Sequence, residues 1–381
     1  MENPFVYGEV VPLAAFADRL DELDRLVRDL ESGQKVFLIS PRRFGKSSLV
    51  RQALRTLGRH GALTAEVPVA THSSYVAFLE GYTSALLALE SKWQRARDWI
   101  RAAIHAAHPE VRLEPVAGDP GRLAVSFTGL RAERDVHRLA AEVFDLPGRL
   151  ATERGRRVVV ALDEFQAITG FDGGTVEQVL REAVQRQRQV GYVFAGSEPT
   201  LMERMIGPRR PFYKAGPVMR LDRIPAEPFA AFVEARFTKS GIRPEAGLGT
   251  AIVELAGNLP YDVQRLAHEA WDDLRAAGRK RASIDDLHLT LRRLLGEQEP
   301  VFEGVWQRLT LPQRAVLRAV VLKEGRELLS ADVRARYRLG GPSSVQHSLA
   351  ALVREDLVMR DHGRFLVIDS LLREWVARWT S

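Results

Sequence analysis

The chain of 381 residues contains no cysteine, and this absence sets the first limit on its chemistry. Without cysteine it has no disulfide bonds and no thiolate ligands for a metal ion. Its first residues, MENPFVYGEVV, lack the basic start and apolar stretch of a secretory signal peptide. No run of about 18 apolar residues indicates a membrane span. We therefore expect a cytoplasmic protein with no membrane partner.

Ligand patterns, repeats and strong charge are also lacking. The nine histidines show no metal-ligand spacing, and no repeat or low-complexity tract is present. A net charge of +6 over this length is a mild bias toward anionic partners. What is present is an ordinary globular composition at a length typical of two or three domains.

Strands and helices alternate through residues 1–224, which we expect to form one α/β core. A hairpin is predicted over 112–127, with its turn at Gly118 to Gly121. The apolar runs that predict strands are 35–40, 62–70, 156–165 and 191–198. Segments with helical periodicity separate these runs. Such alternation is typical of a parallel sheet covered by helices on both faces.

Residues 225–381 follow a different pattern. Four helices are predicted in 225–298, as a helical lid, and the last of them is predicted over 284–295. Residues 299–381 favour three short helices followed by two strands, which is typical of a winged helix-turn-helix domain. Capping signatures predict where four of these helices start: Ser283 with Asp286, Thr310 with Gln313, Ser330, and Ser343 with Gln346.

The stretch SPRRFGKSS, residues 40–48, is nearly a nucleotide-binding phosphate loop, except that Ser40 replaces its first glycine. Gly45 would let the backbone approach phosphates, Lys46 would bind the β- and γ-phosphates, and the Ser47 hydroxyl would bind Mg²⁺. An arginine-rich loop that happens to precede a helix is the alternative. The residues predicted here to bind ATP are Ser40, Pro41, Arg42, Arg43, Phe44, Gly45, Lys46, Ser47 and Ser48.

A carboxylate pair ends the strongest predicted strand, VVVALDEF. Asp163 would hold Mg²⁺ together with Ser47, and Glu164 would orient or deprotonate the attacking water. Acidic residues at strand ends are common in α/β proteins, so the pair alone would say little. Beside Gly45, Lys46 and Ser47 it supplies the second half of an ATP-hydrolysing site.

Two further candidates are less specific. Ser197 ends another predicted strand and could contact the γ-phosphate or the attacking water, or be a plain strand-end serine. The segment GPRRPFYKAGP holds Arg209, Arg210 and Lys214. Arg210 is the predicted catalytic cation, acting as an arginine finger does on γ-phosphate charge. A solvated basic loop is the alternative for this segment.

In this order, the motifs resemble the bacterial and archaeal ATPase family of the STAND/AAA+ type, with its origin-recognition/DEAH-like domain. SPRRFGKSSL is similar to its phosphate loop, in which serine often replaces the first glycine, and VVVALDEFQ is similar to its Walker B strand. GNLPYDVQRLAHEAW resembles the start of its lid, which implies that Pro260 lies near the nucleotide. From the motifs and this resemblance together we expect a Mg²⁺-dependent ATPase that works as a nucleotide-controlled switch, with ATP held between core and lid and its output through the winged helix.

The sequence leaves the partner of the winged helix open. Residues 301–381 hold 13 Lys and Arg against 9 Asp and Glu, which is +4 of the net charge of +6. This bias favours double-stranded DNA, and the protein could then be a DNA-binding regulator with ATP as a slowly hydrolysed or structural ligand. A protein partner or self-association is the alternative. The candidate DNA contacts are Ser344, Gln346 and His347 on the recognition helix predicted over 343–355, and Arg334, Arg336, Arg338, Arg360 and Arg364.

Overall fold

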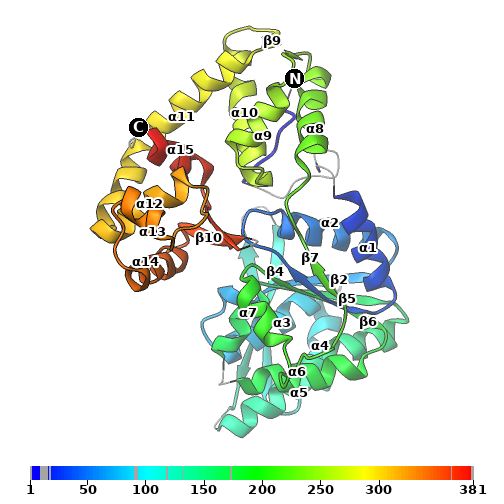
Figure 1. Ribbon diagram of the computed structural model, residues 1–381. Coiled ribbons are helices and arrows are strands. Elements are labelled where there is room, and N and C mark those ends of the chain that lie inside the picture. The colour runs from blue at the N-terminus through cyan, green and yellow to red at the C-terminus, as the bar shows by residue number, and fades with distance from the viewer. Residues whose placement is uncertain are drawn as a thin grey trace. The chain divides into compact units, whose positions relative to one another are not determined.

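The computed structural model divides the chain into two compact units (Figure 1). The first unit runs from Arg19 to Asp222. The second joins the N-terminal residues that precede the first unit to the chain from Arg223 onward. The residues that the structure describes are 2–8, 16, 19–89, 93–116, 119–130, 132–171, 174–361 and 363–378.

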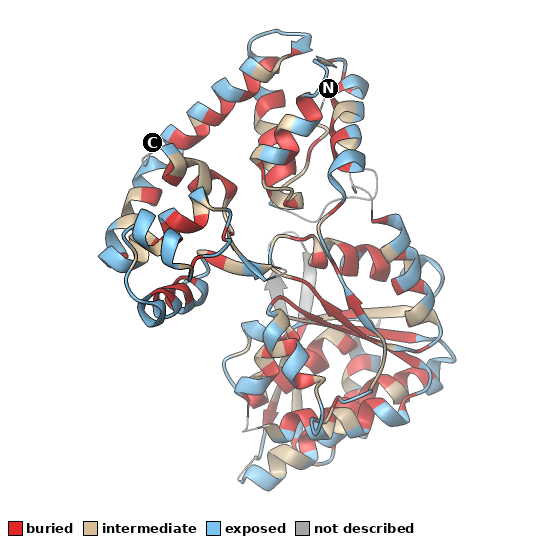
Figure 2. Cartoon of the chain, in the orientation of Figure 1, coloured by how far each residue is buried: buried red, intermediate tan, exposed pale blue. Residues whose placement is uncertain are grey.

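A parallel sheet of five strands forms the centre of the first unit. Its order is β2-β5-β6-β1-β7, and every neighbouring pair is parallel. The central strands are almost entirely buried (Figure 2), as continuous apolar runs such as VVVAL require when both faces of a sheet are covered. The strands are β1 (Lys35–Ile39), β2 (Leu63–Pro68), β5 (Val158–Asp163), β6 (Val190–Gly196) and β7 (Val218–Arg220).

Helices cover both faces of this sheet, with α1 and α2 on one side and α3, α5 and α6 on the other (Figure 1). The predicted α/β class is therefore confirmed. The helices are α1 (Leu20–Glu31), α2 (Lys46–Arg59), α3 (Tyr75–Leu87), α4 (Trp93–Ala103), α5 (Glu133–Arg154), α6 (Thr175–Arg186) and α7 (Pro199–Met205). Two 3₁₀ helices, Val69–Thr71 and Phe165–Gly170, also lie in this unit.

The predicted hairpin is also present, as the antiparallel pair β3 (His108–Val116) and β4 (Asp119–Thr128). Val116 pairs with Asp119, so the turn is tighter than the four residues that the sequence predicts. Pro120 and Gly121 belong to β4 rather than to the turn. Gly118 lies outside the described residues.

The second unit contains the predicted helical lid and winged helix. The lid comprises α8 (Ala226–Lys239), α9 (Leu248–Leu255), α10 (Pro260–Ala276) and α11 (Ile284–Arg308), with the short parallel pair β8 (Arg243–Pro244) and β9 (Arg281–Ala282). The winged helix comprises α12 (Leu311–Leu322), α13 (Ala331–Arg336), α14 (Pro342–Arg354), the antiparallel strands β10 (Val358–Asp361) and β11 (Arg364–Val367), and α15 (Ser370–Arg378). Within the described residues, no helix has the length and apolar character needed to cross a membrane.

The sequence predicts a domain boundary between residues 298 and 299, but lid and winged helix share a continuous helix and a hydrophobic cluster across it. Helix α11 is continuous across that boundary, although Pro300 lies inside it and removes a helical hydrogen bond. Phe302 and Leu309, beyond the proline, are buried in a hydrophobic cluster that residues of lid and winged helix share. This burial offsets the cost of the proline, so the helix predicted over 284–295 extends to Arg308.

Polar contacts also tie the winged helix to the lid. The guanidinium of Arg373, in α15, donates to the backbone carbonyl of Leu255 at the end of α9, at 2.8 Å. The side chain of Arg223 donates to the carbonyl of Gly257 and to Asp361 in β10. Both links end at the turn between α9 and α10, so the second unit is held together at that turn.

The N-terminal residues differ from their predicted place in the core, because they pack against the lid. Phe5 is buried, and its ring centroid lies 4.8 Å from that of Phe237 in α8. The Tyr7 hydroxyl donates to Glu269 of α10 at 2.7 Å. An apolar ring and a tyrosine whose polar tip finds a partner together fasten this extended segment to a helical surface.

Three of the four predicted helix caps are confirmed. Ser283 and Thr310 form reciprocal capping boxes with Asp286 and Gln313, and Ser330 accepts a hydrogen bond from the backbone N–H of Val333. The prediction at Ser343 is wrong. The N-cap of α14 is Gly341, two residues before Ser343, and Pro342 is the first residue of the helix. Proline is pre-organised for that position, which moves the start upstream.

Candidate active site

The phosphate loop joins the end of β1 to the start of α2, and its backbone explains the missing glycine. Ser40 is buried and does not have a positive φ, so it does not need the conformational freedom of glycine. Its N–H donates to the carbonyl of Gly196 at 3.2 Å, and its hydroxyl donates to the carbonyl of Pro41 at 3.0 Å. Serine is therefore compatible with this loop.

The tight part of the loop lies further along. Arg43 has a φ of 69° and Gly45 a φ of 85°, so two nearly adjacent residues are left-handed. Such a φ is uncommon for a residue with a side chain and often marks a functional loop. Gly45 is the N-cap of α2, and no side chain caps it. The backbone N–H groups of the first turn are thus left for an anion.

The other residues predicted in the phosphate loop differ in how much of their surface is exposed to solvent. Phe44 is buried, with 2% of its surface exposed, and Arg42 is exposed to solvent. Pro41 and Ser48 are half-buried. Phe44 is thus placed as a core residue, so any contact of its side chain with a nucleotide stays a prediction.

Lys46 and Ser47 open α2 and face the end of β5. The ammonium group of Lys46 donates to Asp163 and, at 3.2 Å, to Glu164 Oε1. The Ser47 hydroxyl donates to Asp163 Oδ2 at 3.2 Å. Only 5% of Lys46 is exposed, so its charge is largely removed from water and needs these carboxylates. The structure therefore brings together both halves of the predicted site.

This meeting point follows from the sheet topology. Asp163 ends β5 and Ser197 directly follows β6, while the phosphate loop follows β1. These three strands are neighbours and parallel, so their carboxyl ends lie at one edge of the sheet. Ligands of α/β proteins bind at that edge, where the order of strands reverses.

Glu164 is held in a left-handed conformation with a φ of 51°, at the start of the 3₁₀ helix Phe165–Gly170. The next side chain, Phe165, anchors this turn. It is fully buried, and its ring centroid lies 4.6 Å from that of Phe194 and 5.3 Å from that of Phe212. The aromatic cluster fixes the backbone, so the carboxylate of Glu164 is presented to Lys46.

The charge state of Glu164 depends on opposing effects. Burial alone would raise the pKa of Glu164. The Lys46 charge and hydrogen bonds from Ser197, Gln166 and Lys46 outweigh burial and hold this pKa below its ordinary value. Glu164 is therefore ionised at neutral pH and can accept a proton.

Ser197 and Gln166 both contact Glu164 on its second carboxylate oxygen. The Ser197 hydroxyl donates to Glu164 Oε2 at 2.5 Å, and Gln166 Nε2 donates to the same oxygen at 2.6 Å. The sequence predicts Ser197 as a contact of phosphate or water, and the structure places it against Glu164. Gln166 is not among the predicted site residues, and its place two residues after Glu164 is the only signal that points to it.

Arg210 does not join this cluster. It pairs with Glu177 of α6 at 3.2 Å, and Glu177 is almost completely buried. Burial raises the pKa of Glu177, and the charge of Arg210 opposes that effect. Lys214 lies over the ring of Tyr213, 5.3 Å from its centroid. The expectation that Arg210 acts as a finger therefore stays a prediction, and its observed contact is with α6.

Pro260, predicted to lie near the nucleotide, belongs to the second unit. It is the first residue of α10, the position where proline costs no hydrogen bond. The turn before it carries Asn258, whose side chain donates to the carbonyl of Ile224 at 2.7 Å. The geometry of Pro260 is that of a helix start, and its role at a nucleotide stays a prediction.

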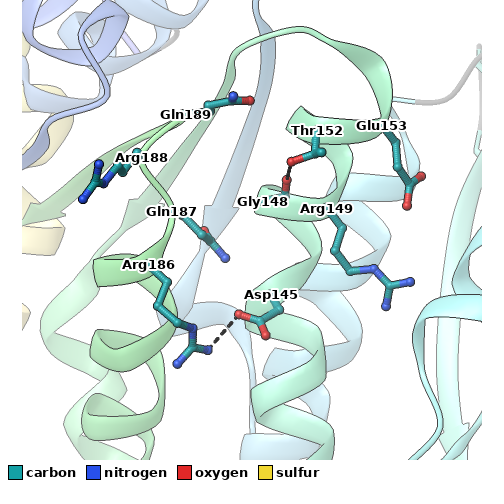
Figure 3. Close-up of a pocket in the computed structure, with 9 residues that line it drawn as sticks. All are labelled: Asp145, Gly148, Arg149, Thr152, Glu153, Arg186, Gln187, Arg188 and Gln189. Atoms are coloured by element: carbon teal, nitrogen blue, oxygen red, sulfur yellow. Dashed lines mark hydrogen bonds and ion pairs between the residues drawn. The ribbon is translucent and has the colours of Figure 1, made fainter.

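A separate cavity of about 540 Å³ lies between α5 and the segment from the end of α6 to the start of β6 (Figure 3). The polar groups on its walls are largely engaged. Arg186 pairs with Asp145 at 3.0 Å, and the Thr152 hydroxyl donates to the carbonyl of Gly148 at 3.0 Å (Figure 3). None of the predicted site residues lines it, so this cavity is distinct from the candidate active site.

Comparison with known proteins agrees with this geometry. Residues 16–266 match a family described as an ATPase domain predominantly from Archaea, and the chain belongs to that family. Residues 300–378 match a probable winged helix domain. The predicted resemblance to an archaeal ATPase family and the predicted C-terminal winged helix are thereby confirmed. No curated protein sequence matches the chain significantly.

Solved structures share the fold across nearly the whole chain. The Walker-type ATPase PABY2304 of Pyrococcus abyssi has a TM-score of 0.64 at 16% identity, covering 98% of this chain and 99% of that one. ORC2 of Aeropyrum pernix, in ADPNP and ADP complexes, has a TM-score of 0.58 at 15% identity, covering 100% and 98%. ORC1 of the same organism, in complex with DNA, has a TM-score of 0.53 at 14% identity, covering 99% and 98%.

Proposed function

We propose that this protein is a Mg²⁺-dependent ATPase that works as a nucleotide-controlled switch, with its output through the winged helix. The observation that carries the proposal is the contact of Lys46 with both Asp163 and Glu164 at the carboxyl edge of the sheet. A buried lysine at the start of a helix, facing two carboxylates, has the parts that ATP hydrolysis requires. The match to an ATPase-domain family supports the ATPase activity in this proposal.

The donor set suits magnesium. The Ser47 hydroxyl and an Asp163 carboxylate oxygen lie 3.2 Å apart, and both are hard oxygen ligands. Mg²⁺ prefers such oxygens and takes few protein ligands when it also binds substrate phosphates. Held by Ser47 and Asp163, Mg²⁺ would supply charge neutralisation on the β- and γ-phosphate oxygens.

The side chains of Lys46 and Glu164 would carry out the remaining steps. Lys46 would leave the carboxylates and bind the β- and γ-phosphates of ATP. Glu164 would then orient a water and accept its proton as the water oxygen attacks the γ-phosphorus. ATP between core and lid would move the lid, which carries the winged helix, and hydrolysis would reverse that movement.

A measurement of phosphate release with Mg²⁺ and with EDTA tests this proposal. We expect hydrolysis only with Mg²⁺. Because Ser47 is one of two expected ligands, Ser47→Ala should raise the Mg²⁺ concentration for half-maximal hydrolysis by about 10- to 100-fold. Ser32→Ala, at an exposed position at the end of α1, serves as the control and should leave it unchanged. Hydrolysis by the unaltered protein in EDTA would contradict the proposal.

A second candidate function, DNA binding, rests on the charge and exposure of the winged helix. Ser344, Gln346 and His347 are exposed on α14. No side chain caps that helix, so the N–H groups of its first turn are available to phosphates. Arg336, Arg338, Arg360 and Arg364 are also exposed. The ORC1 structure in complex with DNA shares this fold, which supports testing the same output here.

A titration of duplex DNA at several salt concentrations, with and without ATP, tests this candidate. Replacing Arg334, Arg336 and Arg338 by alanine is expected to weaken binding and to lower the log–log salt slope by about 0.9 for each phosphate that is no longer neutralised. Arg334 already donates to the carbonyl of Leu329, so the weakening should come mainly from Arg336 and Arg338. The control replaces three exposed arginines of the first unit: Arg55, Arg59 and Arg188. Equal weakening in the control, or no binding by the unaltered protein, would leave a protein partner or self-association as the output.

A further inference from the structure

Gln166 is buried beside the candidate active site, although nothing in the predicted chemistry uses it. Only 6% of its surface is exposed, and its amide lies between Glu164 and Ser197. A carboxylate can only accept hydrogen bonds, so the amide nitrogen must face Glu164. The amide oxygen, Oε1, then points the other way. It is buried and has no hydrogen-bond partner among the described residues.

The space for that amide oxygen exists because residue 196 is glycine. A Cβ atom built on Gly196 would lie 2.9 Å from Gln166 Oε1 and 2.4 Å from the side chain of Met202. Both distances are shorter than ordinary contacts, so a larger residue at 196 would displace the amide. A buried acceptor without a partner costs free energy, so the contacts of the other end of the Gln166 amide need an explanation.

The other end of the amide, the nitrogen of Gln166, contacts Glu164. Its oxygen Oε2 accepts from Gln166 at 2.6 Å and from Ser197 at 2.5 Å, while its oxygen Oε1 accepts from Lys46 at 3.2 Å. Two donors, Gln166 and Ser197, therefore hold Oε2, whereas Lys46 is the one side chain seen to donate to Oε1 among the described residues. When Lys46 turns to phosphates, only Oε1 is released.

We propose that Gln166 is a positioning residue that, with Ser197, fixes Oε2 of Glu164 so that Oε1 is the oxygen that acts on the attacking water. This inference rests on the proposed ATPase function. As the water oxygen bonds to the γ-phosphorus, its proton passes to Glu164 Oε1. The bond from the γ-phosphorus to the bridging oxygen breaks, and its electron pair leaves with ADP. Gln166 itself exchanges no proton.

The test replaces Gln166 by methionine, which has a similar length but neither a hydrogen-bond donor nor the stranded amide oxygen. Misplacement of a catalytic group by a fraction of an ångström to 1 Å can cost up to about 10²-fold, so we expect kcat for ATP hydrolysis to fall by about 10- to 100-fold. KM and the Kd for ATP should stay within about twofold. The melting temperature should stay equal or rise, because the unpaired acceptor is gone.

Two comparisons separate positioning from a purely structural role. Gln178→Met removes a similar amide-to-carboxylate bond, from Gln178 to Glu182 on the exposed face of α6, and should leave kcat unchanged. In a Glu164→Gln background, measured by single turnover, Gln166→Met should have little further effect, because residues that act through one group are not additive.

Each other result overturns the inference. An unchanged kcat in Gln166→Met would mean that the amide does not position Glu164. If Gln166→Met lowers the rate by the same factor in the Glu164→Gln background as in the unaltered protein, Gln166 acts on a group other than Glu164. A lowered melting temperature with an unchanged kcat would assign it a structural role. If the unaltered protein binds ATP but releases no phosphate, the proposed hydrolysis fails, and this inference fails with it.

Discussion

Replacing Glu164 by glutamine is expected to lower kcat for ATP hydrolysis by about 10²–10⁴-fold, which is the usual effect of removing a general base. The substitution keeps the size of the side chain and an oxygen that can still accept from Ser197, so the turn at Phe165 should stay in place. It removes the group that takes the proton of the attacking water. Phosphate release at saturating ATP and Mg²⁺ is the measurement.

ATP binding should survive this change. Glu164→Gln removes a negative charge close to the expected position of the γ-phosphate, so the Kd for ATP should stay equal or fall. Glu203→Gln is a suitable control, because Glu203 lies on the exposed side of α7 and pairs with Arg220 at 2.7 Å. Turnover in Glu164→Gln equal to that of the control would exclude Glu164 as the base.

The second large effect is expected at Lys46. Lys46→Ala should raise the Kd for ATP by about 10²-fold or more, since it removes at least one charge-assisted hydrogen bond worth up to about 3 kcal/mol. Hydrolysis should be abolished at ordinary ATP concentrations. Binding can be measured with a fluorescent ATP analogue or by calorimetry, in the presence of Mg²⁺.

Lys239→Ala provides the control for this substitution, because Lys239 is exposed at the end of α8. The two active-site variants should also differ from each other. Glu164→Gln should bind ATP and fail to turn it over, whereas Lys46→Ala should fail to bind it. If both variants hydrolyse ATP as fast as the unaltered protein, the proposed site is wrong.

The clustering of Lys46, Ser47, Asp163 and Glu164 in the candidate site could be expected from the sequence because the motifs that contain them are local. Lys46 and Ser47 can be recognised in the sequence because they follow a predicted strand and open a predicted helix. Asp163 and Glu164 are defined by the end of an apolar strand. Parallel strand topology then brings these two pairs to one edge, a consequence that the alternation of strands and helices already implies.

Other features depend on contacts between residues far apart in sequence. The pairing of Arg210 with Glu177 is set by the path of a loop whose composition alone suggests only a basic surface. The role of Gln166 depends on the space beside Gly196, 30 positions away. The packing of Phe5 against Phe237 joins the start of the chain to the lid. Periodicity and motif spacing carry no information about such contacts.

The sequence does not indicate how far α11 extends, for a different reason. Proline is a strong signal for the end of a helix, and Pro300 lies close to the expected domain boundary. Tertiary packing of Phe302 and Leu309 outweighs that local preference. The start of α14 shows the opposite case, in which Pro342 determines the boundary and the serine after it does not.

Helix α11 runs without a break from the lid into the start of the winged helix. Its 25 residues span about 37 Å at 1.5 Å per residue, from the lid to the beginning of the winged helix. A tilt of about 10° at the lid end would displace the other end by about 6 Å, which is larger than a single side-chain contact. Because Arg373 and Arg223 also tie the winged helix to the turn between α9 and α10, lid and winged helix would travel as one body in the proposed switch, and the part farthest from the pivot would travel farthest.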